Sequence, residues 1–332
     1  MKLLIFEKNL FYRILIVSLR NNFNVMNFLR GILILFNMEN VMPFFKRTVT
    51  REDNIQNFKD TENLCKTNPN LQSAISKSNE NQKLILENEE IFCEKKVYEN
   101  PAKILVTPNR TFEAAMNYPE KKVAVLNFAS ATNPGGGVVY GSFAQEECLC
   151  RCSTLYFNLT EEKMHKGFYL SHIKQQNPLH NDDIIYTPEV VIFKTDTSYP
   201  KLMKEENWQT VNVITCAAPN LREKPSNIHN SGDGNVSVSI SDNELQLLHE
   251  KRGAKILDVA LAEKNQVVIL GAFGCGAFRN KPEIVVKAYK NLIEKYKFAF
   301  ETIEFAVYCS PRDDSNYRIF KKILEGKGSV VL

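Results

Sequence analysis

The fold is decided by the run Val123-Ala-Val-Leu-Asn-Phe128 and by the loop that follows it, Ala129-Ser-Ala-Thr-Asn-Pro-Gly-Gly-Gly-Val-Val-Tyr-Gly-Ser-Phe-Ala-Gln-Glu-Glu147. Six residues that are apolar almost throughout predict a strand buried on both faces. The three consecutive glycines that come after it interrupt any regular element and permit tight turns. Ligands of open α/β sheets bind in loops at the carboxyl ends of strands, so we expect a binding site in this loop.

The same alternation of apolar runs and helical patterns continues along the chain. Strands are predicted at 104–107, 123–128, 190–194, 211–217, 267–272 and 303–309. Helices are predicted at 111–118, 146–156, 243–263, 282–297 and 317–325. Buried strands that alternate with helices indicate an α/β fold, in which helices cover both faces of one sheet.

Two further segments surround this core. Residues 52–92 are polar with scattered apolar positions and predict helices, one of them capped by Asp60 or Thr61 and ending at the break Asn68-Pro69-Asn70. Residues 222–241 are polar and contain glycine, and loops of that length are usually functional or disordered.

The composition is that of an ordinary globular protein: 332 residues, of which 44% are hydrophobic and 24% charged. These values exclude collagen-like, low-complexity and wholly disordered chains. The net charge of +4 comes from the N-terminal end, because residues 1–50 hold seven Lys or Arg against two Glu. That segment carries +5 and residues 51–332 carry −1. The body of the chain is not basic, so we expect no direct binding to nucleic acid.

Residues 1–47 are predicted to be a basic, apolar extension to a single domain at 48–332, of which 48–100 form a helical N-terminal part. Arginines interrupt its apolar runs, and these runs are shorter than the ~18 residues of a membrane span, so we expect no span. Three interpretations stay open: a basic amphipathic helix lying on a surface, a targeting peptide, or an upstream extension whose true start is Met38 or Met42.

Cysteine and histidine positions predict neither disulfides nor a metal site. The eight cysteines have no spacing of a secreted disulfide framework, so we expect a reduced, cytoplasmic protein. On a helix Cys148 and Cys152 would share a face while Cys150 points away, and no second Cys/His pair follows at finger spacing. The histidines form no ligand motif, and His172 and His180 are expected at the surface or in loops. We therefore expect no cofactor.

A second glycine loop, Gly271-Ala-Phe-Gly-Cys-Gly-Ala-Phe-Arg-Asn280, follows the apolar run 267–270. Glycine lets backbone N–H groups approach and wrap an anion. Neither loop fits the phosphate-loop or the dinucleotide pattern. Two such loops at strand ends, one of them beside paired carboxylates, favour a diphosphate clamp made of backbone rather than of Lys and Arg.

Glu146 and Glu147 supply the candidate chemistry at the start of a predicted helix, where the helix dipole stabilises negative charge. Neighbouring helical residues do not face each other, so these carboxylates cannot straddle one bond as in the usual pair of glycosidase acids. We therefore expect one of them to act on the bond while the other positions the substrate.

These motifs resemble the microbial-type poly(ADP-ribose) glycohydrolase family. The signature is Gly135-Gly136-Gly137 followed after seven residues by Gln145-Glu146-Glu147, together with the second glycine loop. The likeness also takes in Thr215-Cys-Ala-Ala-Pro-Asn-Leu-Arg222 and extends from about residue 51 to the C-terminus. It implies a macrodomain-like three-layer α-β-α sandwich with a mixed central sheet and an N-terminal helical extension.

The resemblance also implies an activity, hydrolysis of the ribose–ribose O-glycosidic bonds of poly(ADP-ribose), mainly from chain ends. Its substrates would be ADP-ribose polymers and poly(ADP-ribosyl)ated proteins, and we expect the protein to be a monomer. Glu147 would be the general acid/base, with Glu146 as the second catalytic carboxylate. The implied substrate-binding residues are Gln145, Asn133, Gly135, Gly136, Gly137, Gly274, Cys275, Gly276, Ala277 and Phe278.

Within that set, Gln145, Glu146, Asn133 and Phe278 would contact the distal ribose, and the glycine loops would bind the diphosphate. The adenine pocket is not identified, and Tyr308 is only a candidate for it. Two alternative functions stay open: a macrodomain that binds ADP-ribose without hydrolysing it, and a hydrolase of ester-linked mono-ADP-ribose.

Overall fold

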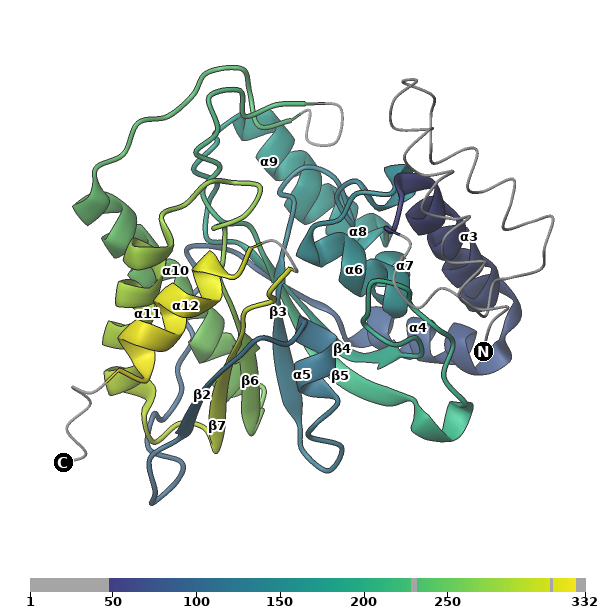
Figure 1. Cartoon of the computed structure of the whole chain (residues 1–332), viewed down its shortest axis with the longest axis horizontal. Helices are drawn as coiled ribbons and strands as arrows, with labels where there is room; N and C mark the ends of the chain where they lie inside the picture. Colours follow the sequence, from purple (N-terminus) through teal and green to yellow (C-terminus); the bar gives the residue numbers. More distant parts are fainter. Residues whose placement is uncertain (1–47, 228–231, 311–312, 327–332) are drawn as a thin grey trace, which may run out of the picture. The chain divides into compact units, whose positions relative to one another are not determined.

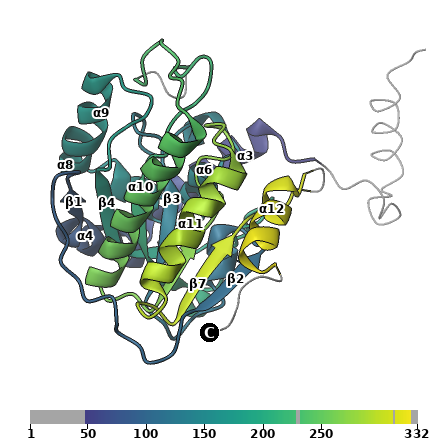
Figure 2. The ribbon, with the colours of Figure 1, turned by 90° about the vertical axis from the view of Figure 1, so that its left-hand side faces the viewer.

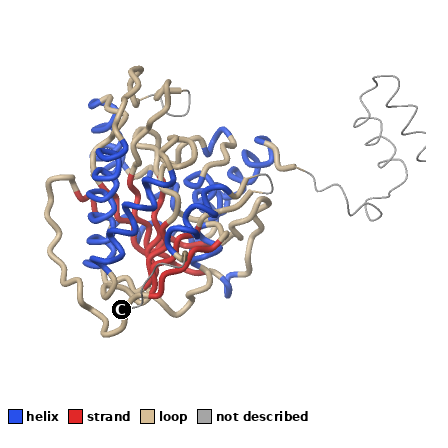
Figure 3. The backbone as a smooth tube through the Cα atoms, turned by 60° about the vertical axis from the view of Figure 1, so that its left-hand side comes forward, coloured by secondary structure: helices blue, strands red, loops and turns tan. Residues whose placement is uncertain are grey.

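Seven strands form one mixed sheet, in the order β1-β4-β5-β3-β6-β7-β2. The computed structural model describes residues 48–227, 232–310 and 313–326. The predicted extension 1–47 lies outside the described residues, as does His229, one of the five histidines of the chain. In Figure 3 the strands occupy the centre, with helices on both sides. Their bounds are β1 Lys83–Ile85, β2 Lys103–Thr107, β3 Val123–Phe128, β4 Ile184–Ile192, β5 Gln209–Cys216, β6 Val267–Leu270 and β7 Thr302–Ala306.

The direction of the strands places the candidate loops together. β5, β3, β6, β7 and β2 run parallel to one another, whereas β4 and β1 are antiparallel to their neighbours. The carboxyl ends of the five parallel strands therefore share one edge of the sheet. Both glycine loops leave from that edge, one after β3 and the other after β6.

Both faces of the sheet are buried, as the apolar run 123–128 predicts. Ala124 and Leu126 of β3 belong to one hydrophobic cluster, while Val123 and Val125 belong to another. The first cluster lies under α10 (Asp242–Ala262), α11 (Pro282–Tyr296) and α12 (Ser315–Leu324). Figures 1 and 2 show these helices together on one face. The predicted three-layer α-β-α arrangement with a mixed sheet is confirmed.

The opposite face is covered by shorter helices, whose apolar side chains form the second cluster. Their bounds are α5 Thr111–Ala115, α6 Gln145–Cys152, α7 Leu155–Leu159, α8 Glu162–Met164 and α9 Leu170–Gln175, with a π-helical turn at His165–Tyr169 and 3₁₀ turns at Val138–Tyr140 and Glu205–Asn207. The helix predicted at 146–156 is wrong in one respect, because Ser153 pairs with Ile192 of β4 and interrupts it.

β4 is longer than the strand predicted at 190–194. Its pairing with β5 shifts register between Thr187 and Val190, and Glu189 between them has φ 53°. Pro188 cannot donate to a sheet, so it sits at this bulge. Because Pro188 and Glu189 interrupt the apolar pattern, the sequence does not predict the first half of β4.

The N-terminal helices are α3 (Arg51–Thr67) and α4 (Pro69–Asn81). Thr50 caps α3 by accepting a hydrogen bond from the Asp53 amide, so the prediction of a cap at Asp60 or Thr61 is wrong. The predicted break at Asn68 is confirmed, because Asn68 ends α3 and its side chain accepts from the first amides of α4. Across the described ranges, no helix combines the length and the apolar character that crossing a membrane requires.

Candidate active site

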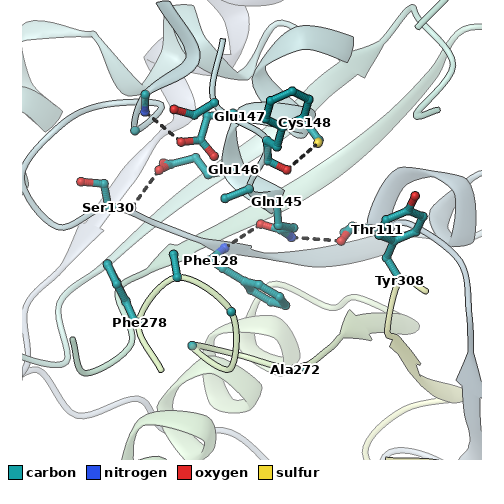
Figure 4. Close-up of a pocket in the computed structure, with 18 of the residues that line it drawn as sticks. Thr111, Phe128, Ser130, Gln145, Glu146, Glu147, Cys148, Ala272, Phe278 and Tyr308 are labelled. Atoms are coloured by element: carbon teal, nitrogen blue, oxygen red, sulfur yellow. Dashed lines mark hydrogen bonds between the residues drawn. The ribbon is translucent and has the colours of Figure 1, made fainter. Parts of the chain in front are cut away.

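A cavity of about 460 Å³ opens at the carboxyl edge of the sheet, between the two glycine loops. Figure 4 shows its walls: α6 and the first glycine loop on one side, and the second glycine loop on the other. Both carboxylates of the sequence signature line it, together with Gly136 and Gly137 of the first loop.

Gln145 fastens the start of α6 to the sheet. Its side-chain oxygen accepts from the Phe128 amide at 2.9 Å, and its side-chain nitrogen donates to the Leu126 carbonyl at 2.8 Å. The same nitrogen donates to the Thr111 hydroxyl at 3.0 Å. The amide of Gln145 is thus engaged with strand β3 and α5, which fixes the first turn of α6 over the cavity.

Glu146 is buried, with 2% of its surface exposed. Its carboxylate accepts from the Asn127 side chain at 3.1 Å and from the Ser130 amide at 2.8 Å. Asn127 also donates to the Thr215 hydroxyl of β5 at 3.2 Å. Burial, and then repulsion from Glu147, raise the pKa of Glu146 to about 8, and the two hydrogen bonds only partly oppose this shift.

Glu147 accepts a 2.9 Å hydrogen bond at Oε1 from the Gly137 amide. Its Oε2 is buried and has no hydrogen-bond partner among the described residues. Both carboxylates converge on Gly136, where a Cβ would lie 2.7 Å from Glu147 Oε1 and 3.1 Å from Glu146 Oε2. Gly136 also has φ 57°, which favours glycine. The first glycine loop therefore shapes the carboxylate pair.

Residues of α3 contact the first glycine loop. Asn54, which is buried, donates to the Gly141 carbonyl at 3.1 Å. Gly141 has φ 71°, and a Cβ there would lie 2.3 Å from the Arg51 carbonyl oxygen. Thr61 of the same helix donates to the Arg151 carbonyl at the far end of α6, at 2.6 Å. The N-terminal helix thus supports both the loop and the helix that carry the signature.

The two glycine loops differ in the backbone amides that they offer. Gly136 donates to the Asn133 carbonyl and Gly137 to Glu147, so both amides are engaged. In the second loop, the amides of Gly276 and Ala277 donate to no acceptor in the described part of the chain. A Cβ on Gly276 would meet nothing within 4 Å, so this backbone faces open space. The second loop is the better anion cradle.

Asn280 holds the second loop in shape. Its side-chain nitrogen donates to the carbonyls of Pro219, Gly274 and Phe278, at 2.7, 3.1 and 3.3 Å. Its side-chain oxygen lies 2.8 Å from Nε2 of His249. Burial lowers the pKa of His249 to about 4, so a neutral ring donates this bond. A buried polar network thus fixes the loop before any ligand arrives.

The opposite end of the cavity carries an arginine and an aromatic ring. The Arg110 guanidinium lies 4.0 Å from the centre of the Tyr308 ring, and Tyr308 is 43% exposed. Arg110 also donates to Cys148 Sγ at 3.3 Å. Tyr308 follows β7 and Thr111 follows β2, so this end lies over the β7–β2 part of the sheet. In Figure 4 Tyr308 and Thr111 lie opposite Phe278 and Ser130.

Nine of the twelve predicted site residues line this cavity. Gly135, Asn133 and Cys275 do not line it, and a Cβ on Gly135 would instead meet the Tyr156 ring at 2.8 Å. The sequence analysis did not single out several other lining residues, although most of them lie just beyond strand ends, the position that marked both glycine loops. They include Arg110, Thr111, Ser130, Asp196, Asn227 and Asn316.

The prediction that His172 and His180 lie at the surface or in loops is wrong for His172, which lies in α9, whereas His180 does lie in a loop, before β4. Both are buried, with 3% and 5% exposed, because backbone carbonyls provide partners for their rings: Phe168 for His172 and Ala218 for His180. Asp196, also buried, accepts from the Phe112 amide at the start of α5. In the part of the chain that the structure covers, no three Cys, His, Asp or Glu side chains form a potential metal site.

The chain is similar in sequence and structure to known proteins. Residues 52–195 match the family model described as the catalytic domain of microbial-type PARG, that is, poly(ADP-ribose) glycohydrolase. The glycohydrolase of Thermomonospora curvata is 26% identical, over 82% of this chain and 99% of that chain, with a TM-score of 0.69. The enzyme of Deinococcus radiodurans in complex with ADP-ribose is 31% identical, over 76% and 98%, with a TM-score of 0.65. No curated protein matches the chain.

Proposed function

The chain belongs to the microbial-type poly(ADP-ribose) glycohydrolase family and is an enzyme of that kind, and we propose that Glu147 is the group that cleaves its substrate. The predicted family and the predicted macrodomain-like α/β fold are both confirmed by the comparisons. The single observation that carries the proposal is the Glu147 carboxylate, whose Oε1 is fixed by Gly137 and whose Oε2 is buried beside the cavity without a partner among the described residues.

Glu147 first acts as an acid. A proton on Oε2 passes to the oxygen that links the two riboses while the bond from that oxygen to the distal-ribose carbon breaks. The remaining charge on the sugar is oxocarbenium-like. A water molecule then adds to the same carbon, and its proton returns to Glu147. The products are free ADP-ribose and a polymer that is shorter by one unit.

Glu146 and Gln145 position this acid. Gln145 fastens α6 to β3, and Glu146 is held by Asn127 and Ser130 directly beside Glu147.

The substrate lies across the sheet edge in a defined direction. Its diphosphate binds the open amides of the second glycine loop, supported by Gly276 facing open space. Its distal ribose lies against Phe278 and the carboxylates, at the β5 end of the cavity. Its adenine lies at the other end, where the exposed ring of Tyr308 offers a stacking surface.

Release of units mainly from chain ends, and a cytoplasmic location, are further parts of the proposal. The family resemblance supports the first and the eight free cysteines support the second. Product analysis at early times distinguishes the modes of cleavage, because end-directed cleavage releases single ADP-ribose units and internal cleavage releases oligomers.

The deciding experiment compares wild type with Glu147→Gln. Incubation with poly(ADP-ribose) and chromatography of the products should show free ADP-ribose from wild type and intact polymer from the variant. Glu147→Gln should still bind ADP-ribose, because the second loop is unchanged. Glu294→Gln, an exposed change on α11, is the matched control and should act like wild type. Hydrolysis by Glu147→Gln at the wild-type rate would show that a residue other than Glu147 cleaves the substrate.

A further inference from the structure

The two ends of the cavity lie over different strands. Asn127 joins Glu146 to Thr215 of β5, so the carboxylates lie toward β5. Tyr308 follows β7, and β3 and β6 separate β5 from β7 in the sheet. In the proposed orientation of the substrate, the distal ribose and the bond to be cleaved are therefore at the β5 end. Whatever is attached beyond that bond leaves the cavity there.

The group beyond the bond is itself charged. In poly(ADP-ribose) the distal ribose of one unit is linked to the adenosine ribose of the next, and that adenosine carries its own diphosphate. A polymer therefore brings a second diphosphate close to the β5 end, whereas free ADP-ribose does not. A cationic group at this end would contact the polymer without contacting the product.

Arg222 is such a group. It follows β5, is half-buried and lines the cavity, with its guanidinium 5.8 Å from the centre of the Phe278 ring. Its Nε donates to the side-chain oxygen of Asn220 at 3.0 Å, and its Nη2 donates to the Pro225 carbonyl. Both acceptors are neutral, so these bonds fix the guanidinium without cancelling its charge.

Buried residues hold this arginine in place. Asn220 is fully buried and donates to the Pro225 carbonyl at 3.1 Å and to Asp233 at 2.6 Å. Asp233 lies 3.2 Å from Nε2 of His180, whose Nδ1 is 2.8 Å from the Ala218 carbonyl. The His180 ring therefore lies between the Asp233 carboxylate and the Ala218 carbonyl. A preorganised site of this kind binds an anion with a smaller cost in side-chain entropy than a free surface arginine.

A second arginine, Arg279, directly follows Phe278 in the sequence. Arg279 is exposed and has φ 59°, a left-handed conformation that is uncommon for a residue other than glycine. Burial lowers the pKa of Arg222, and repulsion from Arg279 adds to that effect against the attraction of Asp233. Arg222 lines the cavity, and the positive charge of Arg279 adds to its attraction for phosphate.

We infer that Arg222, assisted by Arg279, binds the diphosphate of the ADP-ribose unit on the leaving side of the cleaved bond. This inference rests on the proposed function, since it needs the distal ribose at the β5 end. It assigns the two arginines a role in recognising polymer over a single unit. The terminal unit itself is held by the glycine loop and does not use them.

The test compares the full-length wild type with Arg222→Gln, Arg279→Gln and the double variant. Arg222→Gln should raise the KM for poly(ADP-ribose) about tenfold, equivalent to ~1.4 kcal/mol, and the double variant should raise it further. The affinity for ADP-ribose, measured by calorimetry, should stay within about twofold of wild type. The dependence of log KM on log salt should become shallower by about one for each phosphate that the variant no longer neutralises.

Three controls keep the result interpretable. Arg222→Lys keeps the charge and should recover part of the KM. Arg318→Gln removes an exposed arginine from α12 and should change neither the KM nor the salt dependence. Thermal unfolding and the ADP-ribose affinity show whether Arg222→Gln still folds, and if Arg222→Gln unfolds early, the exposed Arg279→Gln alone decides the test.

Two results would overturn the inference. An equal decrease in ADP-ribose and polymer binding would place Arg222 in the site of the terminal unit. If the double variant has the wild-type KM for polymer and the wild-type salt dependence, the two arginines do not bind a diphosphate on the leaving side. Neither result depends on Glu147, whose own variant tests the chemistry separately.

Discussion

The backbone amide of Gly137 donates a 2.9 Å hydrogen bond to Glu147, across the cavity wall that both residues form. This bond fixes one carboxylate oxygen and leaves the other, which is buried beside the cavity, without a hydrogen-bond partner among the described residues. The first glycine loop therefore does more than make room for a ligand. In the proposed mechanism, it sets the direction from which Glu147 reaches the bond to be cleaved.

Gly136→Ala should abolish most of the activity while the protein still folds. A Cβ at this position would lie 2.7 Å from Glu147 Oε1, and the left-handed backbone would cost a further ~1–2 kcal/mol. Displacing the acid by about 1 Å is expected to lower kcat/KM about 100-fold. Steady-state kinetics and thermal unfolding measure the two effects. Gly276→Ala, whose Cβ meets nothing, should unfold at the wild-type temperature, and full activity in Gly136→Ala would contradict the geometry.

Glu146→Gln should change how stability depends on pH. The pKa of Glu146 is raised to about 8 by burial and by Glu147, well above the usual value of ~4.3. Between these two pH values the folded state binds more protons here than the unfolded state, so the free energy of unfolding of the wild type falls as pH rises. The free energy of unfolding of Glu146→Gln lacks this decrease. Relative to that of wild type, it should therefore rise by on the order of 3 kcal/mol between about pH 5 and pH 9.

Denaturant titrations at several pH values measure this difference between wild type and Glu146→Gln. The difference is the relevant quantity, because all other titrating groups are common to both proteins. Glu294→Gln should give a difference that does not vary with pH. A flat difference for Glu146→Gln as well would show that Glu146 ionises as an exposed carboxyl does.

Asn280→Asp should loosen the second glycine loop, although the two side chains have the same shape. Three carbonyls lie within 3.3 Å of the Asn280 side-chain nitrogen, and a carboxylate oxygen in its place would repel all of them. We expect a decrease of about 3 kcal/mol in the free energy of unfolding and a weaker affinity for ADP-ribose. Asn243→Asp, exposed in the first turn of α10, is the control for the change in charge. An unchanged affinity for ADP-ribose would show that the second glycine loop does not bind the diphosphate.

Tyr308→Ala should weaken ADP-ribose binding about tenfold, because stacking of a base on an aromatic ring contributes about 1–3 kcal/mol. Tyr308→Phe keeps the ring and should bind almost as wild type does. Calorimetric titration with ADP-ribose distinguishes the two variants. Equal affinities for Tyr308→Ala and wild type would place adenine elsewhere and would remove the basis for placing the leaving group at the β5 end.

Elements with strong local signals were predictable from the sequence. β3 has the predicted bounds because its apolar residues are buried on both faces, and the break at Asn68 shows in its neighbouring proline. β4 was half missed, because the bulge around Glu189 breaks the apolar pattern although β5 still pairs across it. The helix break at Ser153 was missed for a similar reason, since its partner Ile192 lies 39 positions away.

The candidate site shows the same division. Glu146, Glu147 and most of the glycines could be predicted, because they are contiguous in sequence and lie at strand ends. The burial of His180 could not, because its partners at Ala218 and Asp233 are supplied by other segments of the chain. The different tasks of the two loops were also hidden, since sequence does not show that the Gly137 amide is already occupied.

The contact between Arg51 and Gly141 limits how far this enzyme can be shortened. Helix α3 precedes the sheet and contributes no group to the cavity, so it resembles a removable appendage. Yet the backbone at Arg51 fills the space that a side chain on residue 141 would need, and Asn54 ties down the same loop. A fragment that begins after α3 would lack the floor of its own active-site loop, so the minimal catalytic unit has to begin upstream of the cap at Thr50.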